Sequence, residues 1–218
     1  MRSHNYFYLI LMYVSLFSVV IPFTTGIIRR KYLDSVSNLF FYLVITYLIL
    51  EIVSFSLANY HVNNLFVARI NTVLQFILLS VFFSRAFHST KISLFIKIFI
   101  FFFLGTACID LYLNGLKIMD NLSLTTSCIL LMIYSLLTFF YLIQKPLYSN
   151  ILSTPLFWFN TAVLVYFSGN LFLFLFTNYL LKKSLPLHFN LWTIHSILNI
   201  IFNSLISIGF WKTENQPK

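Results

Sequence analysis

Seven long apolar stretches constrain the fold of this 218-residue chain more than any other feature of its sequence. Each is roughly 20 residues long, which is the length that an α-helix needs to cross the hydrocarbon of a bilayer. The stretch at 98–104 is apolar on every face, whereas the strands of a membrane β-barrel alternate apolar and polar residues. The sequence therefore predicts an all-α membrane protein, a seven-helix bundle with spans at about 6–28, 36–57, 65–84, 92–113, 122–143, 155–181 and 190–211.

The composition excludes the main classes of soluble protein. Only 9% of the residues are charged and 60% are hydrophobic, and the mean hydropathy is +0.89. Soluble domains carry about 25% charged residues. A soluble enzyme, a disordered tail and a nucleic-acid-binding domain are thus excluded, despite the net charge of +9. Because the spans leave only short loops, we expect one membrane domain over 1–218, surrounded by lipid and without an extramembrane domain.

The lysines and arginines predict how the bundle is oriented. Loops on the cytoplasmic side of a membrane carry an excess of these residues. With the N-terminus outside, the inner side holds nine: Arg29, Arg30, Lys31, Arg85, Lys91, Lys97, Lys145, Lys212 and Lys218. The outer side holds five: Arg2, Arg69, Lys117, Lys182 and Lys183. This distribution favours an external N-terminus and an internal C-terminus, although the last two lysines oppose it.

Two parts of the chain share a pattern of polar residues. At a constant offset of 119, the second span matches the sixth: Tyr47, Glu51, Asn59 and Tyr60 correspond to Tyr166, Asn170, Asn178 and Tyr179. The third span likewise resembles the seventh, in which His195 and Asn199 correspond to Asn71 and Gln75. Either spans one to three repeat as five to seven, with the fourth as a connector, or the biased composition produces chance matches. Both interpretations stay open.

Glu51 is the acidic residue that the sequence places well inside a span. Burying such a group at the centre of a bilayer costs about 2–3 kcal/mol on insertion scales, so it faces protein or water. Arg69, Asn71 and Gln75 of the third span lie at a similar depth. A Glu51–Arg69 ion pair or a Glu51–Asn71 hydrogen bond would clamp two helices. The alternatives are a ligand-binding or proton-binding acid, and an isolated protonated side chain.

A polar stripe runs along the seventh span. His195, Asn199 and Asn203 recur every four residues and so share a helix face, with Trp192 one turn before them. These groups either form hydrogen bonds to Asn170 and other polar residues of span six, or line a polar pocket. The candidate ligand-binding residues are therefore Glu51, Arg69, Asn71, Gln75, Asn170, Trp192, His195, Asn199 and Asn203.

No pattern in the chain is typical of catalysis. The sequence contains neither a Gly-x-Ser-x-Gly motif nor the His-x-x-x-His and Glu-x-x-His spacings of helical metal sites. It has five acidic residues in total, of which Asp110 is the only one in a span besides Glu51. We therefore expect a protein that is not an enzyme and that holds no metal or cofactor.

Over nearly its whole length, and most strongly in the last two spans, the chain resembles small seven-helix membrane proteins of the Bacteroidota, some of which are encoded near histidine kinases. The resemblance rests on the run 155–160, the run 166–172, the residues Trp192, His195 and Asn199, and the ending Ile208-Gly209-Phe210-Trp211. It implies a bacterial inner membrane and a role in signalling, and it assigns no functional residues.

Together these features lead to one expectation with two alternatives. We expect a sensory or signalling module that binds a small or lipid-like ligand between spans two, three, six and seven. Its short inner loops would couple to a membrane or cytoplasmic partner. A small-solute transporter that uses the same pocket and a structural subunit without a ligand are the alternatives. The oligomeric state stays open.

Overall fold

A computed structural model describes residues 2–215 of the chain, apart from 88, 117, 145–150 and 184. These residues form helices and no strands, and seven helical segments are long and apolar enough to cross a membrane. The bounds of the seven segments lie within two residues of the predicted spans. The prediction of an all-α, seven-helix membrane protein is therefore confirmed.

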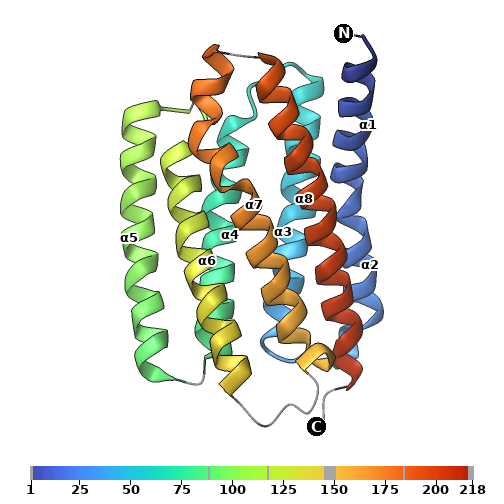
Figure 1. The fold of residues 1–218 in the computed structure, drawn as a ribbon, viewed down its shortest axis with the longest axis vertical. Helices are drawn as coiled ribbons and strands as arrows, with labels where there is room; N and C mark the ends of the chain where they lie inside the picture. The colour runs from blue at the N-terminus through green and yellow to red at the C-terminus, as the bar shows by residue number, and fades with distance from the viewer. Residues whose placement is uncertain (1, 88, 117, 145–150, 184, 216–218) are drawn as a thin grey trace.

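The helices stand side by side in one bundle (Figure 1). The first span consists of α1 (Arg2–Ser18) and α2 (Val20–Ile28). The other six are α3 (Ser37–Asn59), α4 (Leu65–Ala86), α5 (Thr90–Asn114), α6 (Asn121–Gln144), α7 (Pro155–Lys183) and α8 (Leu185–Trp211). Single 3₁₀ turns follow α2, precede α7 and follow α8: η1 (Arg30–Tyr32), η2 (Ile151–Ser153) and η3 (Lys212–Asn215).

The break between α1 and α2 was not predicted. Pro22 lies in the first turn of α2 and has no N–H to donate to the carbonyl of Ser18, so the helical ladder is interrupted there. At the same position, the Ser18 hydroxyl donates a hydrogen bond to the carbonyl of Ser15, at 2.6 Å. The first span is thus two helices that meet at Val19.

Helix α8 packs against α7, α1 and α2, and α7 packs against α6. Helix α4 contacts α3, α5 and α6. Helix α5 stands at the edge of the bundle (Figure 1). In the most apolar 18-residue stretch of α5 only 11% is buried, whereas 50% is buried in that of α7. Helix α5 therefore presents most of its surface to lipid.

The helix neighbours follow the order that a tandem repeat would produce. If spans one to three correspond to five to seven, each contact in one half should have a counterpart in the other. The contact between α1 and α8 then corresponds to that between α6 and α4, and the contact between α3 and α4 corresponds to that between α7 and α8. All four contacts are present. The proposed connector, α5, is the helix at the edge. This arrangement supports the repeat, which stays a prediction.

An aromatic cluster joins four helices near the end of the bundle away from the N-terminus. The Phe159 ring of α7 stacks on Phe40 of α3 with 4.4 Å between ring centroids. It also contacts Phe82 of α4 at 6.3 Å and Phe210 of α8 at 5.3 Å. All four side chains are fully buried, so this end of the bundle is closely packed.

The turn between α3 and α4 is tight and well bonded. His61 adopts the left-handed conformation with φ 56°, and the Val62 N–H donates to the carbonyl of Leu57 at 2.9 Å, as in a Schellman motif. The Asn64 amide nitrogen donates to the Ser54 hydroxyl at 2.8 Å. The turn therefore holds the ends of α3 and α4 side by side.

The two ends of the described chain lie at opposite ends of the bundle (Figure 1). The end with the C-terminus carries Arg29, whose guanidinium lies 3.9 Å from the ring of Trp211. Three lysines used for the orientation, Lys117, Lys145 and Lys218, are outside the described residues. The orientation in the membrane stays a prediction.

That orientation can be tested with reporters. We expect green fluorescent protein fused to the C-terminus to fluoresce in the cytoplasm of a bacterial host, and alkaline phosphatase at the same position to be inactive, because the basic loops stay inside. Fusions of the two reporters to the N-terminus are the control and should give the opposite result. An active C-terminal phosphatase would reverse the predicted orientation.

Gly209 allows α7 and α8 to approach each other. A Cβ atom at this position would lie 2.4 Å from the Phe159 ring, which is held between Phe40 and Phe210. We expect Gly209→Ala to destabilise the protein by about 1–3 kcal/mol, the usual effect of overpacking. Gly105→Ala is the control, because a Cβ there meets nothing within 4 Å. Unfolding in mixed micelles measures both variants, and equal stability of the two would contradict the packing.

Candidate functional site

A cavity of about 400 Å³ lies between α1, α3, α4 and α8, in the half of the bundle near the N-terminus. Its size is within the range of small-molecule sites, roughly 300–1,000 Å³. Side chains able to form hydrogen bonds contribute much of its wall: Tyr8, Ser15, Tyr47, Glu51, Ser54, Asn64, Asn71, Trp192, His195, Ser196 and Asn199. The bundle thus holds a partly open cavity at membrane depth, with many hydrogen-bonding groups in its wall.

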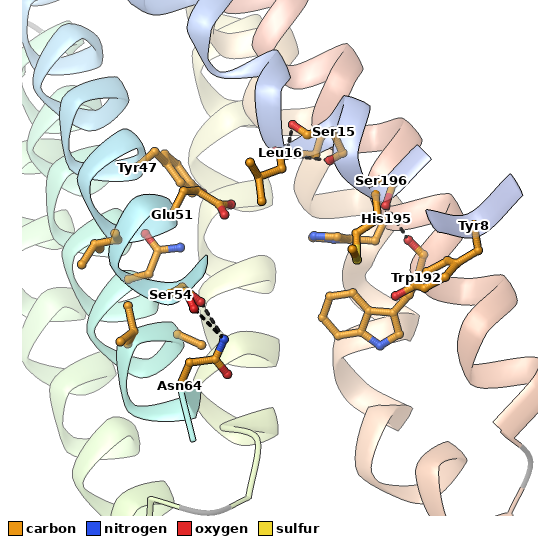
Figure 2. Close-up of a pocket in the computed structure, with 16 residues that line it drawn as sticks. Tyr8, Ser15, Leu16, Tyr47, Glu51, Ser54, Asn64, Trp192, His195 and Ser196 are labelled. Atoms are coloured by element: carbon orange, nitrogen blue, oxygen red, sulfur yellow. Dashed lines mark hydrogen bonds between the residues drawn. The ribbon is translucent and has the colours of Figure 1, made fainter. Parts of the chain in front are cut away.

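Glu51 and His195 lie on opposite walls of this cavity. Figure 2 shows Glu51 extending from α3, with Trp192 and His195 facing it from α8. Among the described residues, the Glu51 carboxylate has no hydrogen-bond or ion-pair partner. A carboxylate without a partner inside a helix bundle is costly unless water or a ligand solvates it.

The imidazole of His195 is held by a chain of hydrogen bonds from α7. The Asn170 amide nitrogen donates to the carbonyl of Tyr166 at 2.9 Å, which directs the Asn170 Oδ1 atom to Nδ1 of His195, also at 2.9 Å. An amide oxygen only accepts, so Nδ1 carries the proton and the neutral ring has its lone pair on Nε2. Asn170 is fully buried and therefore acts as the support of His195.

The rest of the polar stripe on α8 binds α1. The Asn199 amide nitrogen donates to the Ser15 hydroxyl at 3.0 Å, and that of Asn203 donates to the Ser18 hydroxyl at 2.7 Å. The expectation that the whole stripe pairs with span six is therefore wrong beyond His195. Steps of four residues advance about 40° around a helix, so the stripe turns from α7 toward α1.

A second, smaller cavity of about 150 Å³ adjoins the first. The two share the side chains of Tyr47, Glu51, Asn71, His195 and Asn199. The smaller one extends to Gln75, Asp120 and Tyr166. Asp120 precedes α6, outside the spans, and burial raises the pKa of its carboxyl group. The polar region therefore reaches from α1 across the bundle to the start of α6.

Arg69 belongs to a different cluster. Its Nη2 atom donates to the carbonyl of Ile118 at 2.9 Å and lies 3.8 Å from Oδ1 of Asp110. Asp110 is fully buried and also accepts hydrogen bonds from the Ser123 backbone N–H at 2.8 Å and the Asn114 amide at 2.6 Å. This network ties α4, α5 and α6 together.

The Glu51–Arg69 ion pair, one of the alternatives for Glu51, is therefore wrong, because Arg69 pairs with Asp110. Asn71 faces the cavity, and two residues correspond to about 200° around a helix, so Arg69 points to the other side of α4. The sequence places both residues at a depth similar to that of Glu51. It does not show which of the two faces Glu51.

The structure brings most of the candidate residues together. Those that line the larger cavity are Glu51, Asn71, Trp192, His195 and Asn199, and Gln75 lines the smaller one. Asn170 lies behind His195, while Arg69 and Asn203 hold helices together.

The wall that α1 forms was not predicted from the sequence. Tyr8 and Ser15 line the cavity, but such residues are common in apolar helices and carry no distinct signal. Tyr47 and Tyr166 were noted only as repeat positions, although both line the smaller cavity. Their matching offset was the signal that could have identified them.

The cavity contains no evident metal centre. Within the described part of the chain, no group of three or more His, Cys, Asp and Glu side chains is placed to hold a metal ion.

No family model matches this chain, and neither a curated protein nor a solved structure is similar enough to match it. The chemistry of the cavity is therefore the basis for a functional proposal.

The different roles of Arg69 and Glu51 can be measured. We expect Arg69→Ala to destabilise the protein by about 3–5 kcal/mol, because it leaves the buried Asp110 carboxylate without its cation. Glu51→Gln should cause no loss of stability, because that carboxylate has no partner to lose and an uncharged amide is less costly to bury. Unfolding in mixed micelles compares the two. A loss of stability in Glu51→Gln would contradict these assignments.

Proposed function

We propose that this protein is a membrane receptor that binds a small ligand in the cavity between α1, α3, α4 and α8. The observation that carries the proposal is the open carboxylate of Glu51, which faces a fixed imidazole across about 400 Å³ of space. Polar groups without partners are expensive at membrane depth, and a bound ligand would compensate these.

The polar groups outside the cavity support this proposal by contrast. Ser135 and Asn160 form three mutual hydrogen bonds between α6 and α7, at 2.7, 3.0 and 3.1 Å. Asp110 accepts three hydrogen bonds in addition to its ion pair with Arg69. A purely structural role would predict the same saturation around Glu51. The Glu51 carboxylate, in contrast with that of Asp110, accepts no hydrogen bond from the described residues.

Ligand binding would reach the rest of the bundle through α8. His195 faces the cavity, while Asn199 and Asn203 on the same helix hold α1 next to its break at Val19. A shift of α8 would therefore alter how α1 and α2 pack. We propose that a partner protein in a bacterial inner membrane reads this change. The resemblance to proteins encoded near histidine kinases favours a kinase as the partner.

A transporter is the second candidate. The adjoining smaller cavity favours it, because a polar path that continues past Gln75 toward Tyr166 is what a moving solute would use. The two functions differ in a measurable way. A transporter moves its ligand across proteoliposomes, whereas a receptor binds the ligand without flux and co-purifies with a partner.

Filling the cavity tests the receptor proposal. Ala68 lines both cavities, and Ala107 lines a separate apolar groove between α4 and α5. We expect small molecules extracted from the host cell to raise the unfolding temperature of the wild-type protein and of Ala107→Phe in lipid nanodiscs. Ala68→Phe should lose this response, because the ring occupies the ligand's space. An equal response from all three proteins would overturn the proposal.

A further inference from the structure

We infer that the cavity selects a small protonated amine with an apolar body. This inference rests on the proposed function and concerns only the chemical class of the ligand. The hydrogen-bonding groups that the cavity leaves unused carry it, because a ligand must complement those groups rather than the ones already paired.

Three donor groups of the cavity are bonded to the protein itself. The amide nitrogen of Asn199 is bonded to Ser15, and that of Asn64 is bonded to Ser54. The protonated Nδ1 of His195 is bonded to Asn170. The geometry of these bonds turns the opposite atom of each group away from its partner.

The same three side chains leave acceptors open. The Oδ1 atoms of Asn64 and Asn199 and the Nε2 atom of His195 have no hydrogen-bond partner within the described residues. The Glu51 carboxylate adds a negative charge, and no lysine or arginine lines the larger cavity. Acceptors around a carboxylate match an ammonium group, which has three donors and a positive charge. A carboxylate or phosphate ligand would be repelled by Glu51 and would find no cationic side chain in the wall of the larger cavity.

The aromatic walls suit the same ligand. Tyr8, Tyr47 and Trp192 line the cavity, and Trp192 lies next to His195 with 4.9 Å between their ring centroids. A cation over the face of such a ring is attracted by the negative charge of its π system, and more strongly so when it is shielded from water. The cavity is larger than an ammonium ion alone requires, so its apolar side chains, such as Met12 and Leu16, would contact the body of the ligand.

The test uses matched triads of small molecules on the full-length protein in nanodiscs. Each triad has one aryl or alkyl skeleton that ends in an ammonium, a hydroxyl or a carboxylate group, such as phenethylamine, phenethyl alcohol and phenylpropionate. We expect calorimetry to show that the ammonium members bind at least about tenfold more tightly than their partners, a difference of about 1.4 kcal/mol. Glu51→Gln should weaken ammonium binding by a similar factor.

The control variant is Asp34→Asn. It removes one negative charge at the other end of the bundle, and its amide oxygen can still accept the Ser37 N–H bond at the start of α3. This variant should bind the ammonium members as tightly as the wild-type protein does.

Nanodiscs with and without phosphatidylethanolamine separate a free amine from a lipid headgroup. If the free amine binds more weakly in nanodiscs that contain phosphatidylethanolamine, the lipid ammonium is the occupant. If it binds equally in both kinds of nanodisc, the occupant is a soluble amine.

The two ways of failing are distinct. If hydroxyl or carboxylate members bind as tightly as the ammonium members, and Ala68→Phe removes that binding, the receptor proposal survives and the amine inference is overturned. The same holds if Glu51→Gln binds ammonium members as well as Asp34→Asn does. If no member of any triad binds the wild-type protein in either nanodisc, both proposals are overturned.

Discussion

The need of every polar group in the bilayer for a partner governs this structure. Helices satisfy their own backbone, so the side chains decide which helices meet. Asn160 with Ser135 and Asp110 with Arg69 connect neighbouring helices in this way. The Glu51 carboxylate differs from that of Asp110, because it has no hydrogen-bond or ion-pair partner among the described residues. This difference between two carboxylates inside the spans separates a group that holds helices together from a group that is open to a ligand.

The membrane fold was largely predictable because hydropathy over roughly 20 residues reports the length of a span directly. The helix ends were predictable because polar and charged residues cluster between the apolar stretches. The break at Val19 was not, although Pro22 signals it, because proline is tolerated in membrane helices when other groups bond the freed carbonyl. The left-handed residue in the α3–α4 turn was also hidden, because His61 occupies a position where glycine is usual.

The site was predictable only in part, for a geometric reason. The sequence shows the depth of a residue and its angle around its own helix, but not which neighbour that face meets. His195 was therefore found, and its partner Asn170 was among the candidates. Arg69 was assigned to the pocket by depth alone, and it points the other way. The contribution of α1 could not be found, because nothing in its apolar sequence shows that it packs on α8.

One helix carries both kinds of polar group, and this has a mechanical consequence. Over two turns, α8 passes from His195, which leaves an acceptor open to the cavity, to Asn203, whose amide is bonded to Ser18. A ligand that draws His195 toward Glu51 would move the α1 contacts with it, since a helix is stiff over so short a distance. Ser18, which accepts the Asn203 bond, lies next to Val19, where the first span is divided into α1 and α2. A ligand-induced shift of α8 would therefore reach the break in that span.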